Sequence, residues 1–396
     1  MGFRVSVLLC AFLCACAGPR PAEPPPAFLF RDDAFAAPAE RFRADDLFAL
    51  SEPMRQFLAK VQVHEWKTLG QAEGLVHALY QKGQLKLEYD GSRTRTAAEA
   101  FEARAGNCLS LVIMTAAFAK ELGLHVEYQS AMTKELWSRN GDLLLGSGHV
   151  NVTLSYGRIN GVSPTYQWGK SALLVDFVPS DEIRGLPLRE VPEQTIVAMY
   201  MNNRAVEALV RGELDDAYGW ARAAIRRSPG FANSYNTLGV VYLRHDDLAQ
   251  AERVFRFELE RDPGDTTVMS NLADVLSRTG REAEATALRS RLARLDPNPP
   301  YHFFELGMEA MRRNDFQAAR RLFAKEVYRA DYNDEFHYWL GIAYLKLGDV
   351  ERARRQLLLA LDRSRARSEH DLYAAKLAWL QSHAQPVEPA PDPLPH

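Results

Sequence analysis

A long apolar run stands out in the first half of the chain. Residues 109–122 are apolar on every side except near the end of the run, and Gly123 stops it. A helix that is apolar all round belongs in a protein core. Asn107 stands just before the run, and asparagine is a good cap for a helix N-terminus. The pattern therefore predicts a buried helix with Cys108 in its first turn.

Alternating patterns follow this helix. Residues 149–156 alternate between polar and apolar positions, with His149 on the polar face, which is typical of a half-buried strand. Residues 172–178 form a second strand pattern that is apolar except for Asp176. Burying a carboxylate is costly unless it is paired and hydrogen-bonded. A histidine on the neighbouring strand is a suitable partner, so we expect His149 and Asp176 to meet.

These patterns bring three chemically useful side chains into one predicted domain. The free N–H groups and the dipole of a helix N-terminus favour a negative group, so a thiol at Cys108 should lose its proton easily. A thiol nucleophile, the His149 imidazole as base and an orienting Asp176 carboxylate suit acyl transfer. The alternative is that Cys108 is a small core residue. A metal site of Cys108, His125 and His149 is disfavoured because no paired ligand spacing supports it, and we expect no metal and no cofactor.

The order of these residues resembles that of a known family. Four runs match the motifs of the bacterial transglutaminase-like domain, namely residues 96–101, 104–110, 149–152 and 175–177. In that superfamily a helix-borne cysteine packs on an antiparallel sheet that carries the histidine and the aspartate, as in papain-like proteins. The resemblance implies an α+β domain over residues 45–195 with a catalytic triad of Cys108, His149 and Asp176.

The same resemblance implies an activity. Such a triad would act on the amide bonds of proteins or peptides, and hydrolysis is favoured over cross-linking because water is the default acceptor. Some members of the superfamily have lost catalysis. The alternative is therefore a non-catalytic scaffold of the cell envelope that mediates protein–protein interactions.

The second half of the chain repeats every 34 residues. Small residues recur at this interval at Ala205, Gly239, Ala273, Gly307 and Gly341. One unit runs through Tyr235, Leu238, Gly239, Tyr242, Ala251, Phe255 and Pro263. This order resembles the tetratricopeptide repeat (TPR), and it implies an all-α solenoid over residues 198–383 with about five repeats and a closing helix. Such a solenoid binds a protein or peptide partner in its groove; the alternative is that the repeats only support the first domain.

The N-terminus carries an export pattern. Arg4 precedes an apolar run that is too short to span a bilayer, which is typical of a signal peptide, here residues 1–15. The end of this run resembles the lipobox of bacterial lipoproteins, in which the last cysteine, here Cys16, is acylated. The alternative is an ordinary signal peptide cut near Ala17. The resemblance implies a lipid-anchored protein of the bacterial cell envelope, on the outer membrane facing the periplasm.

Composition adds little beyond this organisation. The 396 residues are 47% hydrophobic and 25% charged, as in an ordinary folded protein of two or three domains. A net charge of −3 gives no sign of a nucleic-acid partner. The Pro- and Ala-rich residues 16–44 are expected to form an extended tether, and residues 384–396 a disordered tail. After loss of the signal and acylation of Cys16, Cys108 would be the one remaining thiol, so no intramolecular disulfide is expected.

Overall fold

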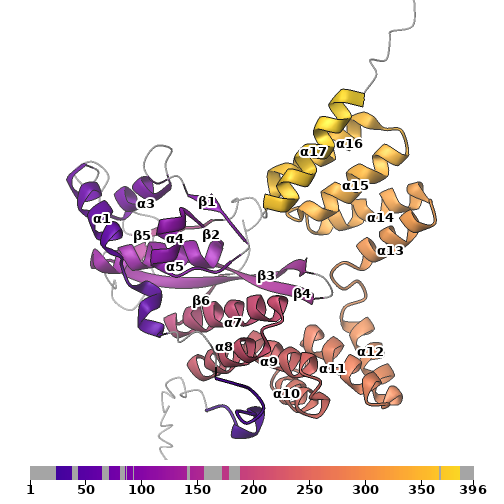
Figure 1. The fold of residues 1–396 in the computed structure, drawn as a ribbon, viewed down its shortest axis with the longest axis horizontal. Coiled ribbons are helices and arrows are strands. Elements are labelled where there is room, and N and C mark those ends of the chain that lie inside the picture. The colour runs from indigo at the N-terminus through magenta and orange to yellow at the C-terminus, as the bar shows by residue number, and fades with distance from the viewer. Residues whose placement is uncertain are drawn as a thin grey trace, which may run out of the picture.

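An α+β part and a helical solenoid make up the computed structural model (Figure 1). It describes residues 24–37, 43–64, 71–80, 85, 87–91, 93–140, 143–155, 172–177, 188–364 and 367–383. The predicted signal peptide, Cys16 and residues 384–396 lie outside the described residues.

The first part contains a buried central helix with shorter helices around it. Its helices are η2 (Ala44–Phe48), α1 (Glu52–His64), α3 (Gln71–Tyr80), α4 (Ala97–Ala103) and α5 (Cys108–Glu121). In α5, every residue from Leu109 to Ala119 is buried. The helix predicted from the apolar run is thus confirmed.

A four-stranded antiparallel sheet lies against α5. Its strands are β3 (His125–Asn140), β4 (Leu143–Ser155), β5 (Ala172–Val175) and β6 (Leu188–Val191), in the order β5-β4-β3-β6. A separate parallel pair joins β1 (Glu88–Tyr89) to β2 (Ala105–Gly106). Both predicted strands are present, but β5 ends at Val175, so Asp176 directly follows the strand rather than lying within it.

The solenoid consists of helix pairs. The pairs are α7 (Glu193–Arg211) with α8 (Leu214–Arg227), α9 (Ala232–Arg244) with α10 (Leu248–Arg261), α11 (Thr266–Arg278) with α12 (Glu282–Leu295), α13 (His302–Arg312) with α14 (Phe316–Arg329), and α15 (Asp334–Lys346) with α16 (Val350–Arg363). Helix α17 (Arg367–His383) closes the array. The small residues of the repeat have a steric reason. A Cβ on Gly239 would lie 2.3 Å from the Phe255 ring, and one on Gly307 would lie 2.5 Å from the Phe323 ring.

The hydrophobic core does not follow the predicted domain boundary. One cluster runs from Leu29 through α5 and the sheet to Ala285 in the third repeat, and a separate cluster begins at Tyr301 in the fourth. Figure 1 shows the corresponding separation between α12 and α13. At the position where other repeats carry Phe255 or Phe323, the third repeat carries an exposed arginine, Arg289. The third repeat therefore lacks the large apolar side chain that would continue the core.

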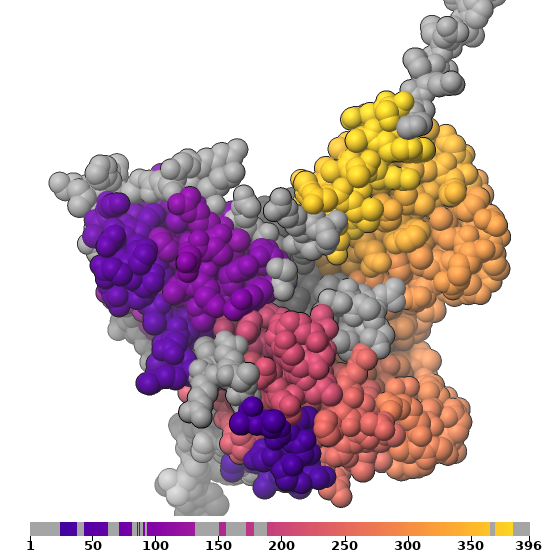
Figure 2. Space-filling model, viewed as in Figure 1, coloured from indigo at the N-terminus to yellow at the C-terminus, as the bar shows by residue number. Residues whose placement is uncertain are grey.

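Part of the expected tether is packed. Residues 24–37 lie on α8 and α10, with Leu29 of the short helix η1 (Ala27–Leu29) fully buried (Figure 2). Three phenylalanines beside this leucine, Phe28, Phe30 and Phe35, contact aromatic or arginine side chains of the repeats. The expectation of an extended tether over residues 16–44 is wrong for this stretch. The apolar residues among the prolines and alanines supply enough burial to dock it.

Candidate functional site

Cys108 is the first residue of α5, and the chain in front of it is held tightly. The Asn107 side-chain oxygen accepts hydrogen bonds from the Ser110 N–H at 2.9 Å and the Ser110 hydroxyl at 2.8 Å. A Cβ on Gly106 would lie 2.8 Å from the Ser110 Cβ, so this turn needs glycine. The Cys108 thiol is free and half-buried. It thus lies at a capped helix N-terminus, where backbone N–H groups favour a negative group.

Asp176 lies at the end of β5 beside a buried amide. The Asn151 side-chain nitrogen donates a hydrogen bond to the carboxylate at 3.2 Å, and Asn151 is fully buried. Val152 pairs with Val175 in the antiparallel register, which places Asp176 opposite Asn151. His149 stands two residues before Asn151 on β4, so alternation gives its backbone position the same sheet face. Diagonal neighbours of this kind are within reach of long side chains. The His149 side chain lies outside the described residues, so the triad stays a prediction.

The connection between α5 and β3 brings Cys108 to the level of His149. Helix α5 has 14 residues and is about 21 Å long. A tight turn at Gly123, with φ of 70°, returns the chain along β3. The strand from His125 to Ala131 covers about 20 Å. Ala131 pairs with His149, so a helix of this length that runs antiparallel to β3 begins at about the level of this point of β4.

One face of α5 turns toward the end of β5. Cys108 precedes Thr115 by seven residues, so the two share a helix face. The Thr115 hydroxyl lies 2.6 Å from the Tyr80 hydroxyl, and burial raises the pKa of Tyr80. The Tyr80 ring lies 5.2 Å from the ring of Phe177, the residue after Asp176. The helix face that carries Thr115 therefore lies near the end of β5.

Sequence reasoning missed a buried polar layer on the sheet. Asn151, Thr153 and Ser155 were expected on a half-exposed face, but all three are buried, and Gln129 is buried beside them. Within the described part of the chain, oxygen atoms of Gln129, Asn151 and Thr153 have no hydrogen-bond partner. The alternation placed these residues on one face but gave no sign that the face is covered.

The metal site considered from the sequence includes His149, whose side chain lies outside the described residues. Among the described residues, no three His, Cys, Asp or Glu side chains are grouped so as to hold a metal ion. His125 lies 3.3 Å from the Glu127 carboxylate. None of the helices in the described ranges is both long and apolar enough to cross a bilayer.

The docked N-terminal segment forms a second site. The Tyr242 hydroxyl donates to the Leu29 carbonyl at 2.8 Å, and Gln250 donates to the Phe28 carbonyl at 2.6 Å. The Tyr218 hydroxyl accepts from the Arg31 N–H at 3.0 Å. Burial raises the pKa of Tyr242 to about 12. The repeats therefore already hold one peptide segment, that of their own chain.

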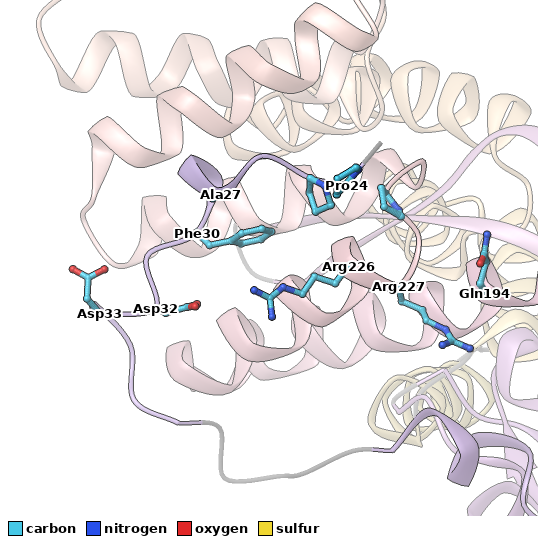
Figure 3. Close-up of a pocket in the computed structure, with 10 residues that line it drawn as sticks. Pro24, Ala27, Phe30, Asp32, Asp33, Gln194, Arg226 and Arg227 are labelled. Carbon is cyan, nitrogen blue, oxygen red and sulfur yellow. The ribbon is translucent and has the colours of Figure 1, made fainter. Parts of the chain in front are cut away.

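A cavity of about 1020 Å³ opens beside this segment (Figure 3). Its lining includes Phe30 and Asp32 from the segment, Arg226 and Arg227 from α8, and Gln194 from α7. The predicted catalytic residues do not line it. The cavity is thus a feature of the docked segment and not of the cysteine site.

The repeats place the C-terminal half in a known class. The family model of the tetratricopeptide repeat matches residues 236–300 and 304–369. This half of the chain is therefore a TPR solenoid, as its 34-residue period predicted.

Solved structures with the repeat fold are similar to this half of the chain. YrrB, described as a TPR protein with an unusual peptide-binding site, is 22% identical, with 46% of this chain and 92% of that one covered and a TM-score of 0.25. A thermophilic TPR protein of Thermus thermophilus is 17% identical over 46% and 99%, with a TM-score of 0.30. The pilF protein of Pseudomonas aeruginosa is 18% identical over 48% and 87%, with a TM-score of 0.30. None of the curated proteins matches the chain.

Proposed function

We propose that the α+β part is a transglutaminase-like cysteine enzyme that acts on amide bonds of proteins or peptides. The observation that carries the proposal is the position of Cys108. It begins a capped, buried helix that packs against β4, the strand that carries His149, and β4 pairs with β5, which Asp176 directly follows. A thiol at a helix start, a histidine on a strand and an aspartate directly after the neighbouring strand are the elements of the family that the sequence motifs resemble.

The reaction follows from these positions. The Cys108 sulfur attacks the carbonyl carbon of the amide, and His149 takes the thiol proton and passes it to the leaving amine. Asp176 fixes the tautomer of the imidazole and stabilises its protonated form. Backbone N–H groups at the start of α5 stabilise the oxyanion. Water then hydrolyses the thioester, so the net reaction is amide hydrolysis.

A peptide library tests this activity. Mass spectrometry of the library after incubation with the protein separates backbone cleavage, deamidation of glutamine and amine cross-linking. The wild type should give one of these products, Asp176→Asn should give it more slowly, and Cys108→Ala should give none. Equal product from Cys108→Ala would exclude Cys108 as the nucleophile.

A non-catalytic scaffold is the second candidate function. It is favoured by the continuous core between the α+β part and the first repeats, and by the peptide that the repeats already hold. In this case the TPR solenoid binds a partner protein, and Cys108→Ala leaves partner capture and cellular function unchanged. A loss of function in Cys108→Ala, with partner capture intact, would exclude the scaffold.

We also propose that Cys16 anchors the chain to the outer membrane on its periplasmic side. An alkyne-tagged fatty acid fed to cells should label the wild type and not Cys16→Ser. The Cys16→Ser variant should leave the membrane fraction. A wild type that carries no lipid by mass spectrometry would contradict the anchor.

A further inference from the structure

Helix α7, the first helix of the solenoid, contacts residues near the start and residues near the end of α5. Near the end of α5, Glu193 of α7 forms an ion pair with Lys120 and accepts a hydrogen bond from the Tyr128 hydroxyl at 2.9 Å. Near the start of α5, Asn203 and Glu207 of α7 contact the loop that carries Thr94. Helix α7 therefore spans the length of the helix that begins with Cys108.

Thr94 is the junction between α7 and the start of α5. Its hydroxyl oxygen accepts hydrogen bonds from the side chains of Asn203 at 3.2 Å and Asn107 at 2.9 Å. Its backbone N–H donates to the Glu207 carboxylate at 2.6 Å. Thr94 is only 1% exposed, and burial raises the pKa of Glu207 while Thr94 and Arg204 oppose the rise. Buried hydrogen bonds of this kind fix geometry more firmly than a solvated contact would.

The Asn107 side chain connects Thr94 to the first turn of α5. Its side-chain nitrogen is held by Thr94, and its side-chain oxygen caps α5 by accepting from Ser110. The Ser110 hydroxyl accepts in turn from the Arg95 N–H at 2.8 Å. The amide of Asn107 therefore cannot rotate without breaking a bond to Thr94 or to the helix. Its orientation sets the first turn of α5, which contains Cys108.

We infer that Asn203 of the first repeat is a positioning residue for Cys108, acting through Thr94 and Asn107. In this role the first repeat fixes the position of the N–H groups in the first turn of α5 relative to the Cys108 thiol. This role is additional to the binding of a partner. The inference rests on the proposed role of Cys108 as a nucleophile. It makes the α+β part and the first repeat one functional unit.

Alkylation of Cys108 in the full chain tests the inference without a substrate. The rate is followed with iodoacetamide by mass spectrometry of the peptide that contains Cys108, so other cysteines do not interfere. Thr94→Val removes the shared oxygen and should slow alkylation about threefold, the order expected when a helix terminus interacts less well with a charge. Thr94→Ser keeps the oxygen and should restore the rate. Asn203→Ala should resemble Thr94→Val.

Asn236→Ala is the matched control. Asn236 also lies on the first helix of a repeat, and it bonds to Asn271 at 2.8 Å rather than to the α+β part. In the Asn236→Ala variant, Cys108 should be alkylated at the wild-type rate. A wild-type rate in a folded Asn203→Ala, or an equal loss in Asn236→Ala, would overturn the inference. If Thr94→Val does not fold, the comparison of Asn203→Ala with Asn236→Ala decides.

The outcome is separable from that of the proposed enzyme. If the wild type turns over no peptide, the proposed enzymatic activity is excluded, but the alkylation rates of the variants can still be compared. A wild type that turns over peptide while Asn203→Ala alkylates normally removes the positioning role alone.

Discussion

The first two repeats and the last two share one sequence pattern but are built into the molecule in different ways. The first two pack into the core that contains α5 and the sheet, and the docked segment around Leu29 covers α8 and α10. The last two have a core of their own around Phe304 and Phe323, and α17 packs on a further cluster around Leu357. The 34-residue pattern therefore fixes how a helix pair packs internally, while the residues at its margins decide what the pair joins.

The third repeat separates the two regions. Arg289 replaces the large apolar residue of the pattern and forms an ion pair with Glu282 at 2.9 Å. A charged side chain cannot extend a hydrophobic core without a large desolvation cost. The distal repeats are consequently packed apart from the core that contains α5.

Truncation should give the largest difference between the regions. A chain that ends after residue 296 keeps the whole first core and should remain folded, with cooperative melting by circular dichroism. A chain that ends after residue 192 loses α7 and the repeats that complete this core, and it should be insoluble or unfolded. A stable product from the shorter chain would contradict the shared core.

Matched glycine substitutions should show a smaller difference. Gly239→Val and Gly307→Val both force a side chain against the ring of Phe255 or Phe323, which costs about 1–3 kcal/mol. Hydrogen exchange should speed up throughout the first core in Gly239→Val, including α5. In Gly307→Val the faster exchange should be confined to α13 and the helices after it. Faster exchange of α5 in Gly307→Val would show that the two cores are coupled.

Substitution of two buried glutamates, one in each region, should give the smallest difference in stability between the regions. Burial raises the pKa of Glu258 in the second repeat from 4.5 to about 7. The folded state thus holds this proton more tightly, and the stabilising contribution is present at low pH and lost as pH rises from about 4.5 to 7, by on the order of 1–3 kcal/mol. Glu258→Gln should remove this pH dependence in thermal unfolding and stabilise the protein at pH 8.

Glu326→Gln is the comparison in the fourth repeat. The Glu326 carboxylate accepts the backbone N–H of Phe303 at 2.8 Å at the start of α13, and the substitution should weaken this bond. It should lower the melting temperature at pH 8, where Glu258→Gln raises it. If both substitutions shifted the melting temperature at pH 8 in the same direction, the local partners of these glutamates would not determine the effect.

The sequence predicted those features that depend on local pattern. The apolar run with Asn107 in front gave α5, the alternation at residues 149–156 gave β4, and the 34-residue period gave the solenoid. Each feature arises from residues within one helix, strand or repeat. The polar face of β4 was also placed, since alternation is a property of the strand alone.

The missed features depend on contacts between distant segments. Leu29 bonds to Tyr242, which is 213 residues away, so a local reading of the Pro- and Ala-rich stretch gave only a tether. The burial of Asn151 depends on what covers the sheet, and the bonds from Thr94 to Asn203 and Glu207 join two predicted domains. No periodicity within one segment reports such contacts.

Detection of an acyl group on Cys108 is the sharpest test of Cys108 as the nucleophile. The wild type and Asp176→Asn are mixed with a peptide substrate found in the library, quenched in acid after short times, and digested for peptide mass mapping. If Cys108 is the nucleophile, its peptide should carry a thioester that hydroxylamine removes, because acyl transfer passes through this intermediate. It should form more slowly in Asp176→Asn, whose imidazole is less well held. Substrate turnover with no acyl group on Cys108 at any time, or an acyl group on another residue, would contradict the account.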